Sequence, residues 1–216
     1  NIERNMQFEL GDCYRKIKKI KESLQCLILS ANQNYLQAQC YLGCIFYMRK
    51  DIRNAIHYFT LAADQNDLYA QNNLAVIYYQ GIYIAQDINK AIYYFTLAAN
   101  QNNPYAESNL GQIFYLGKYI ARNINKSIYY FTLAAQQNDL LSQYNLGIIY
   151  YEGKYVEQDI NKAIYYFTLA ANQKCSEAQA RLGMIYYYAK YIKQDISKAI
   201  YYFTLAANQN DSEAQA

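Results

Sequence analysis

The chain has 216 residues, of which 17% are charged, and its formal net charge is +3 at pH 7. This mild balance lacks the concentrated positive charge that binders of the phosphate backbone carry, so nucleic acid is not the expected partner. Asn, Gln, Lys and Asp interrupt the apolar runs every few residues. No stretch approaches the roughly 20 apolar residues of a membrane helix, and we expect no membrane insertion.

A ten-residue block, KAIYYFTLAA, begins at Lys90 and returns further along the chain at a constant interval of 36 residues. Near copies begin at Lys126, Lys162 and Lys198, a looser copy at Asn54 and a degenerate one at Glu22. Self-similarity at a fixed period is typical of repeat proteins, in which each unit packs only on its neighbours. We therefore expect an array of units and not one or two globular domains.

Alignment on this block gives six units and the start of a seventh, within a single helical-repeat array that spans residues 1–216. The units cover residues 6–37, 38–69, 70–105, 106–141, 142–177 and 178–213, and the seventh starts at 214–216. The first two units are shorter by four residues, which are missing from the loop between their helices. Because the chain has no initiator Met and stops as a unit begins, we expect it to be part of a longer array.

Each unit contains two segments with the hydrophobic periodicity of helices. In the third unit, residues 70–80 place apolar side chains on one face, and residues 87–101 form a wide apolar stripe. Neither helix can bury its apolar face alone, so neighbouring pairs must stack. Small residues beside the core stripe of the first helix are expected to oppose alanine pairs on the second, with the helix axes about 8–10 Å apart. These residues are Gly43, Ala75, Gly111, Gly147 and Gly183.

Short polar residues mark the predicted helix ends. An Asp or Asn stands where it can cap the second helix, a contact worth about 1 kcal/mol. The predicted caps are Asp51, Asp87, Asn123, Asp159 and Asp195. After the second helix, an Asn occupies the position where a left-handed residue commonly ends a helix. These asparagines are Asn34, Asn66, Asn102, Asn138 and Asn210. Lys174 takes this place in the fifth unit and predicts an altered helix end, and Pro104 falls between units.

The fifth unit contains a pattern of small, aromatic and charged residues. The pattern consists of Leu146-Gly147, Tyr150, Gly153, Asp159, Lys162-Ala163, Tyr166-Phe167 and Ala170-Ala171. It resembles the Sel-1-like repeat family, relatives of the tetratricopeptide repeats, and the resemblance covers nearly the whole chain. Tyrosine replaces the family's second loop glycine at Tyr83, Tyr119, Tyr155 and Tyr191. The resemblance implies an all-α, right-handed superhelical α-solenoid of antiparallel helix pairs, whose concave face binds protein partners as a scaffold or adaptor.

Signs of catalysis, metal binding and cofactor binding are absent from the sequence. The one histidine, His57, aligns with outward tyrosines of the second helix, where a general base has no pocket. Neither the histidine nor the cysteines form ligand pairs with zinc spacing, and no phosphate-binding glycine motif occurs. We therefore predict no enzyme, no catalytic residue, no metal, no cofactor and no small-molecule substrate.

Five cysteines are an odd number, and only Cys40 and Cys44 are close in sequence, at a helical spacing. They imply no disulfide framework, so we expect a reducing, cytoplasmic setting. A secretory compartment is the alternative, in which the sequons at Asn125 and Asn210 would become relevant.

The lysines that open the repeated block, Lys90, Lys126, Lys162 and Lys198, have two interpretations. Such an evenly spaced cationic ladder could follow phosphates or an acidic protein surface. The simpler interpretation is that each lysine lies one turn from an Asp or Asn cap and solvates the flank of its helix.

Tyrosine is unusually abundant, with 28 residues. One column, Tyr47, Tyr79, Tyr115, Tyr151 and Tyr187, lies on the predicted outward face of the first helix, which the resemblance places on the concave side. Tyrosine is common at binding surfaces because it offers a large contact area with little rotamer entropy. Variable positions flank the column and include Asn72, Ser108, Tyr144 and Gln112. We predict these nine residues to be the partner-binding site; the alternative is that the tyrosines only pack between helices.

Three functions follow from these observations. The leading hypothesis is a non-catalytic scaffold or adaptor that holds a protein or an extended peptide along its concave face. The second is a structural spacer within a larger assembly, which contacts its neighbours through the convex face and the loop tyrosines. The third is helical-repeat RNA recognition through stacking tyrosines and the lysine ladder.

Overall fold

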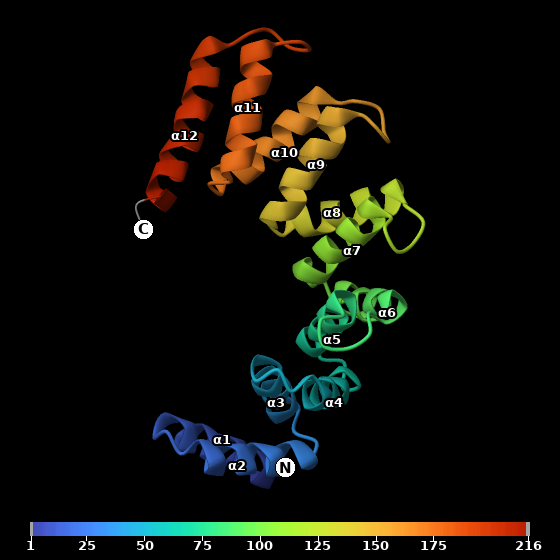
Figure 1. Ribbon diagram of the computed structural model, residues 1–216, viewed down its shortest axis with the longest axis vertical. Helices are drawn as coiled ribbons and strands as arrows, with labels where there is room; N and C mark the ends of the chain where they lie inside the picture. Colours follow the sequence, from blue (N-terminus) through green and yellow to red (C-terminus); the bar gives the residue numbers. More distant parts are fainter. Residues whose placement is uncertain (1, 215–216) are drawn as a thin grey trace. The chain divides into compact units, whose positions relative to one another are not determined.

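The computed structural model describes the backbone of residues 2–214 and the side chains of residues 3–209. Within this part of the chain there are twelve α-helices and no strand, so the protein is all-α (Figure 1). Successive helices form pairs whose members pack against each other. The pairs are α1 (Ile2–Lys16) with α2 (Ile20–Asn32), α3 (Leu36–Met48) with α4 (Ile52–Ala63), α5 (Leu68–Gln80) with α6 (Ile88–Ala99), α7 (Pro104–Leu116) with α8 (Ile124–Gln136), α9 (Leu140–Glu152) with α10 (Ile160–Asn172), and α11 (Ser176–Tyr188) with α12 (Ile196–Ala214).

The chain divides into two compact units, an N-terminal unit, Asn1–Ala106, and a C-terminal unit, Glu107–Ala216. In the N-terminal unit α2 packs on α3 and α4 on α5, and in the C-terminal unit α8 packs on α9 and α10 on α11. Within each unit, neighbouring pairs therefore bury their apolar faces against each other, as expected for a repeat protein. The fold is an all-α repeat solenoid.

The core of the four pairs from α3–α4 to α9–α10 is built around one phenylalanine from the second helix. Phe59, Phe95, Phe131 and Phe167 are at most 2% exposed. A Cβ atom added to Gly111 would lie 2.5 Å from the ring of Phe131, and Gly43 and Gly147 are equally close to their own phenylalanines. The predicted contact with alanine pairs was therefore wrong. The middle of one antiparallel helix faces the middle of the other, where the phenylalanine lies.

The predicted caps of the second helices are confirmed. Each side-chain oxygen accepts a hydrogen bond from the backbone N–H three residues later, at 2.9–3.3 Å. Asp67, Asn103 and Asp139 cap first helices in the same way, which the sequence analysis did not predict. Pro104 is the first residue of α7, where a helix needs no N–H donor, so it interrupts no helix.

The ends of the second helices confirm four predictions and correct two. The left-handed residues include Asn34, Asn66, Asn102 and Asn138, with φ between 60° and 66°. Lys174 has φ 65° and the same turn, in which its N–H donates to Ala171 O at 3.0 Å. An altered end was wrongly predicted there, because the turn depends on the backbone conformation and not on the Asn side chain. The helix end predicted at Asn210 was also wrong, since α12 continues to Ala214.

The predicted seventh unit, at 214–216, lies outside the described residues except for the last residue of α12. No helix among residues 2–214 is both long and apolar enough to cross a membrane.

Candidate functional site

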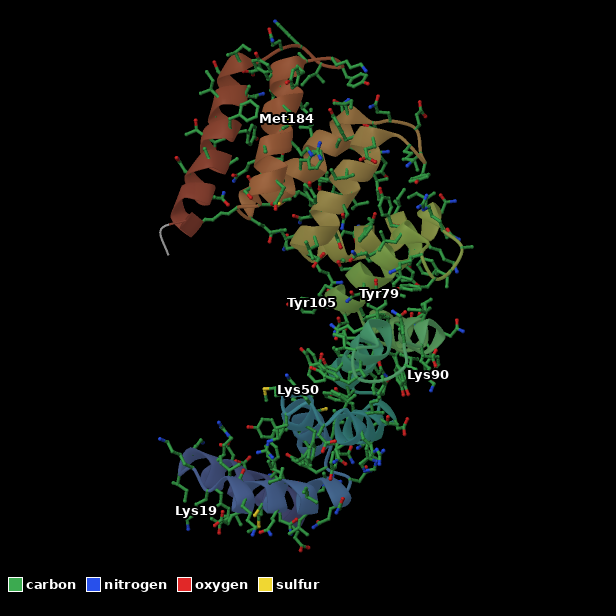
Figure 2. All side chains as sticks on the ribbon, viewed as in Figure 1. Lys19, Lys50, Tyr79, Lys90, Tyr105 and Met184 are labelled. Atoms are coloured by element: carbon green, nitrogen blue, oxygen red, sulfur yellow. The ribbon has the colours of Figure 1, made fainter. Side chains whose placement is uncertain are left out.

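The five tyrosines of the predicted column each stand at the penultimate position of a first helix, just before a loop. We call Tyr47, Tyr79, Tyr115, Tyr151 and Tyr187 the tyrosine ladder. The first four are partly buried, and Tyr187 is 48% exposed. Figure 2 labels Tyr79 of the ladder. It also labels Met184, which precedes Tyr187 on α11.

The ladder rings contact both their own helix pair and the next one. Tyr79 meets Phe95 edge to face, with ring centroids 6.5 Å apart, and Tyr151 meets Phe167 at the same distance. Tyr47 donates its hydroxyl hydrogen to Gln80 Oε1, on the following first helix, at 3.2 Å. Burial raises the pKa of the Tyr115 hydroxyl. Each ladder ring is therefore partly exposed to solvent and partly packed against neighbouring side chains.

The four variable positions of the predicted site lie in different surroundings. Ser108 donates to Asp139 Oδ1 at 3.0 Å, so it touches the cap of the next first helix. The Tyr144 ring rests on Phe167, with centroids 5.8 Å apart. Asn72 Oδ1 is buried and accepts no hydrogen bond from the described side chains. Gln112 is exposed.

The structure brings loop tyrosines and ladder tyrosines together, although the sequence analysis assigned them to separate surfaces. Tyr115 at the end of α7 meets Tyr155 in the loop after α9, with ring centroids 6.3 Å apart. The guanidinium of Arg122 lies 4.5 Å from the Tyr155 ring centroid and is hydrogen-bonded to the Tyr155 hydroxyl. Arg122 also donates to Tyr115 O at 2.8 Å. Arg122 was not predicted from the sequence. Its signal there is that the other three long repeats have Gln at the equivalent loop position.

Three lysines in the loops of the C-terminal unit each lie over the ring of the tyrosine that follows them. The Nζ-to-centroid distances are 4.7 Å for Lys118 and Tyr119, 5.1 Å for Lys154 and Tyr155, and 5.0 Å for Lys190 and Tyr191. Lys190 also lowers the pKa of the Tyr191 hydroxyl through a hydrogen bond. We call these three pairs, together with Arg122, the lysine–tyrosine edge. The sequence signal that was missed is a Lys-Tyr dipeptide that recurs every 36 residues.

The lysines of the repeated block stay close to their own helix pair. Lys162 Nζ lies 3.3 Å from the Asp159 cap and 4.9 Å from the Tyr150 ring centroid. Lys90 and Lys198 make the equivalent contacts, and Lys126 lies over Phe114. These contacts favour the interpretation that the lysines solvate the flanks of the second helices.

A column of buried amides, not predicted from the sequence, joins successive helix pairs. Gln143 on α9 accepts from Gln173, which follows α10, at 2.8 Å, and donates to Ala135 O of the preceding pair at 3.2 Å. Gln39, Gln71 and Gln179 take the same place in other pairs. Glu107 replaces the glutamine on α7, accepts from Gln137 at 2.8 Å and is 1% exposed. Burial raises the pKa of Glu107 to about 7.

The residues with reactive side chains are dispersed. His57 is exposed on α4 and meets the neighbouring Tyr58 edge to face. Burial, together with the nearby Asp67, raises the pKa of the Cys40 thiol, which disfavours the reactive thiolate. Among the described residues, no three His, Cys, Asp or Glu side chains are grouped as metal ligands.

Comparison with protein families matches the Sel1 repeat to residues 36–67, 68–103, 104–139, 140–175 and 176–211. Among solved structures, a protective antigen of uropathogenic Escherichia coli strains that displays an SLR fold is 26% identical, with a TM-score of 0.88 over 99% of this chain. The alignment covers 47% of the antigen, so this chain spans about half of its length. A Sel1 repeat protein from Oxalobacter formigenes is 28% identical, with a TM-score of 0.75, over 94% of this chain and 84% of that one. Comparison with curated proteins gave no match.

Proposed function

Because the chain belongs to the Sel1 repeat family, whose members are generally protein-interaction scaffolds, we propose that it is a non-catalytic scaffold that binds a partner protein or an extended peptide. The binding surface in this proposal is the face formed by the first helices, with the tyrosine ladder along it.

The observation that supports this proposal is the repeated placement of the ladder. Its members stand at the same end of five first helices, held by contacts at their inner edges and accessible at their outer edges. A tyrosine fixed in this way loses little conformational entropy on binding. Exposed residues that differ between repeats, such as Gln112 and Met184, flank the ladder and can discriminate between partners.

The test is to replace Tyr115 and Tyr151 with alanine and to measure recovery of the partner by affinity purification from the native source. We expect recovery to fall roughly tenfold or more, as truncation of buried aromatic anchors does. The matched control replaces Tyr93 and Tyr129, which are 58% and 59% exposed on second helices, and should leave recovery unchanged. Circular dichroism checks that both variants keep their helices. Equal recovery with the ladder variant and the wild type would contradict the proposal.

The alternative function, a structural spacer within a larger assembly, is supported by the exposed loop tyrosines. Tyr83, Tyr119 and Tyr191 are 53%, 44% and 47% exposed. In a spacer, neighbouring subunits would contact these loops, and substitutions in the ladder would leave the assembly intact. Cross-linking of the native assembly, followed by mass spectrometry, distinguishes the two functions. Links to the first helices would indicate a scaffold, and links to the loops would indicate a spacer.

A further inference from the structure

The three long loops of the C-terminal unit differ in charge from the one long loop of the N-terminal unit. Residues 117–126, 153–162 and 189–198 together contain eight Lys or Arg and three Asp or Glu, whereas residues 81–90 contain one of each. Two of the three acids, Asp159 and Asp195, are engaged as helix caps. The lysine–tyrosine edge is therefore a basic surface, and Ile82 replaces its lysine in the N-terminal unit.

The three loops are physically connected, so their charges act on one surface. Arg122 of the first loop reaches Tyr155 of the second, as described above. Gln158 of the second loop is hydrogen-bonded to the Tyr191 hydroxyl of the third. A hollow of about 440 Å³ lies where the second and third loops meet. Its lining includes the donors Gln158, Lys162 and Tyr191 together with the carboxylates Glu157 and Asp159, and Lys162 is paired with Asp159.

The geometry points to an acidic, extended polypeptide segment as the occupant of the lysine–tyrosine edge, and this inference rests on the proposed scaffold function. Ammonium, guanidinium and phenol groups are all donors suited to carboxylates. In this proposal the lysines of neighbouring loops repeat at about the 8–10 Å spacing of packed helices, and an extended chain rises about 3.3 Å per residue. An acidic residue at about every third position of the ligand would therefore meet successive lysines.

A peptide fits this edge better than a nucleic acid does. Glu152 and Glu157 are exposed beside Lys154, so the surface alternates in charge. A nucleic acid carries a phosphate on every nucleotide, so it cannot place a neutral or basic group opposite these carboxylates. A polypeptide can place its acidic side chains opposite the lysines and a neutral or basic side chain opposite each glutamate.

The probes are labelled peptides of about 12 residues, bound to the whole chain and followed by fluorescence anisotropy at about 50 mM salt. One has Glu at every third position with Ser and Gly elsewhere, a second has the same composition with its Glu residues contiguous, and a third has Gln in place of Glu. We expect the spaced acidic peptide to bind best and the Gln peptide not to bind. The affinity of the spaced acidic peptide should fall as the salt concentration rises, because exposed charges are screened.

The variant K154Q/K190Q removes two charges from the edge, and we expect it to weaken binding of the spaced peptide about five- to tenfold. K154R/K190R keeps the charges and should keep most of the affinity. The matched control K21Q/R53Q removes two exposed charges from the N-terminal unit and should have no effect. Unchanged binding by K154Q/K190Q, or equal binding of the contiguous peptide, overturns the inference. Tighter, lysine-dependent binding of an oligouridylate of matched length also overturns it and assigns the edge to nucleic acid.

The two proposals can fail separately. If the native partner depends on Tyr115 and Tyr151 but not on Lys154 and Lys190, the scaffold function stands and the acidic ligand is wrong. The reverse result is that the spaced peptide binds through the lysines while recovery of the native partner does not depend on the ladder tyrosines. The acidic ligand of the lysine–tyrosine edge then stands, and the first-helix face is not the binding surface.

Discussion

Glu107 is a carboxyl group at a position where four other helix pairs have a buried glutamine. A glutamine both accepts and donates through its amide, whereas an ionised carboxylate only accepts. Glu107 accepts a hydrogen bond from Gln137, and its burial favours the neutral form. At neutral pH the protein therefore holds a partly ionised group where the repeat is built for an amide.

This residue predicts a pH dependence of stability. The pKa of Glu107 is about 7 in the folded protein, against an ordinary value of 4.5, so the folded state binds more protons between those pH values. Stability should therefore fall as the pH rises from about 4.5 to about 7 and then level off. Glu107→Gln should remove this fall and gain about 1–3 kcal/mol at pH 8, measured by urea unfolding at several pH values.

The control for this prediction is Glu177→Gln, because Glu177 is exposed and its pKa is lowered by hydrogen bonds to the backbone and side chains of its helix start. That change should not raise stability at pH 8. A Glu107→Gln protein whose stability follows the same pH profile as the wild type would show that Glu107 is not the responsible group.

At the scale of the helix, the second helix of each long repeat starts in the same way. The cap residue accepts from the N–H three residues later, and a lysine in the same turn approaches the cap carboxylate. Asn123 fills this place in one repeat and makes the same cap bond without a charge. The hydrogen bond to the backbone is therefore the shared element, and the exposed ion pair adds little.

Removal of one cap should show this difference. Asp159→Ala leaves an N–H of α10 without its partner and should cost about 1 kcal/mol of stability. Asp159→Asn keeps the cap bond, as Asn123 does, and should cost only a few tenths of that amount. Thermal or urea unfolding of the two variants measures the difference. Equal losses in both would indicate that the ion pair with Lys162 is the main contribution.

The helices, the second-helix caps and the left-handed turns could be predicted from the sequence because they depend on residues close together in the chain. The same reasoning failed at Lys174, where a backbone preference was attributed to a side chain. Contacts between pairs could not be predicted in this way. Arg122 and Tyr155 are 33 residues apart, and their contact depends on how the loops are stacked. Buried glutamines were missed because a polar residue gives no hydrophobic signal even where a partner amide satisfies it.

At the scale of the whole molecule, the chain divides into two compact units, and within each unit the described helix pairs pack on their neighbours in sequence. The stability of such an array is approximately a sum over repeats and their interfaces. Damage to one repeat should therefore remain local and should not spread evenly through the chain.

Phe167→Ala tests this locality. The side chain is fully buried between α9 and α10, and its truncation should cost about 3–5 kcal/mol. Hydrogen exchange should become faster in α9, α10 and α11, while the amides of α1 to α4 keep their protection. Phe59→Ala, the matching change in the N-terminal unit, should give the opposite pattern. Uniform loss of protection in both variants would show that the chain unfolds as one cooperative body.

The amide column has a consequence for the length of the molecule. Because Gln39, Gln143 and Gln179 each donate to an alanine carbonyl of the preceding pair, the surface that one pair offers to the next is nearly the same at each of these junctions. Excision of one whole repeat would bring together two surfaces that already match, and duplication of a repeat would create another matching surface. The number of repeats can therefore vary in evolution independently of the packing, and a longer or shorter array needs no new core.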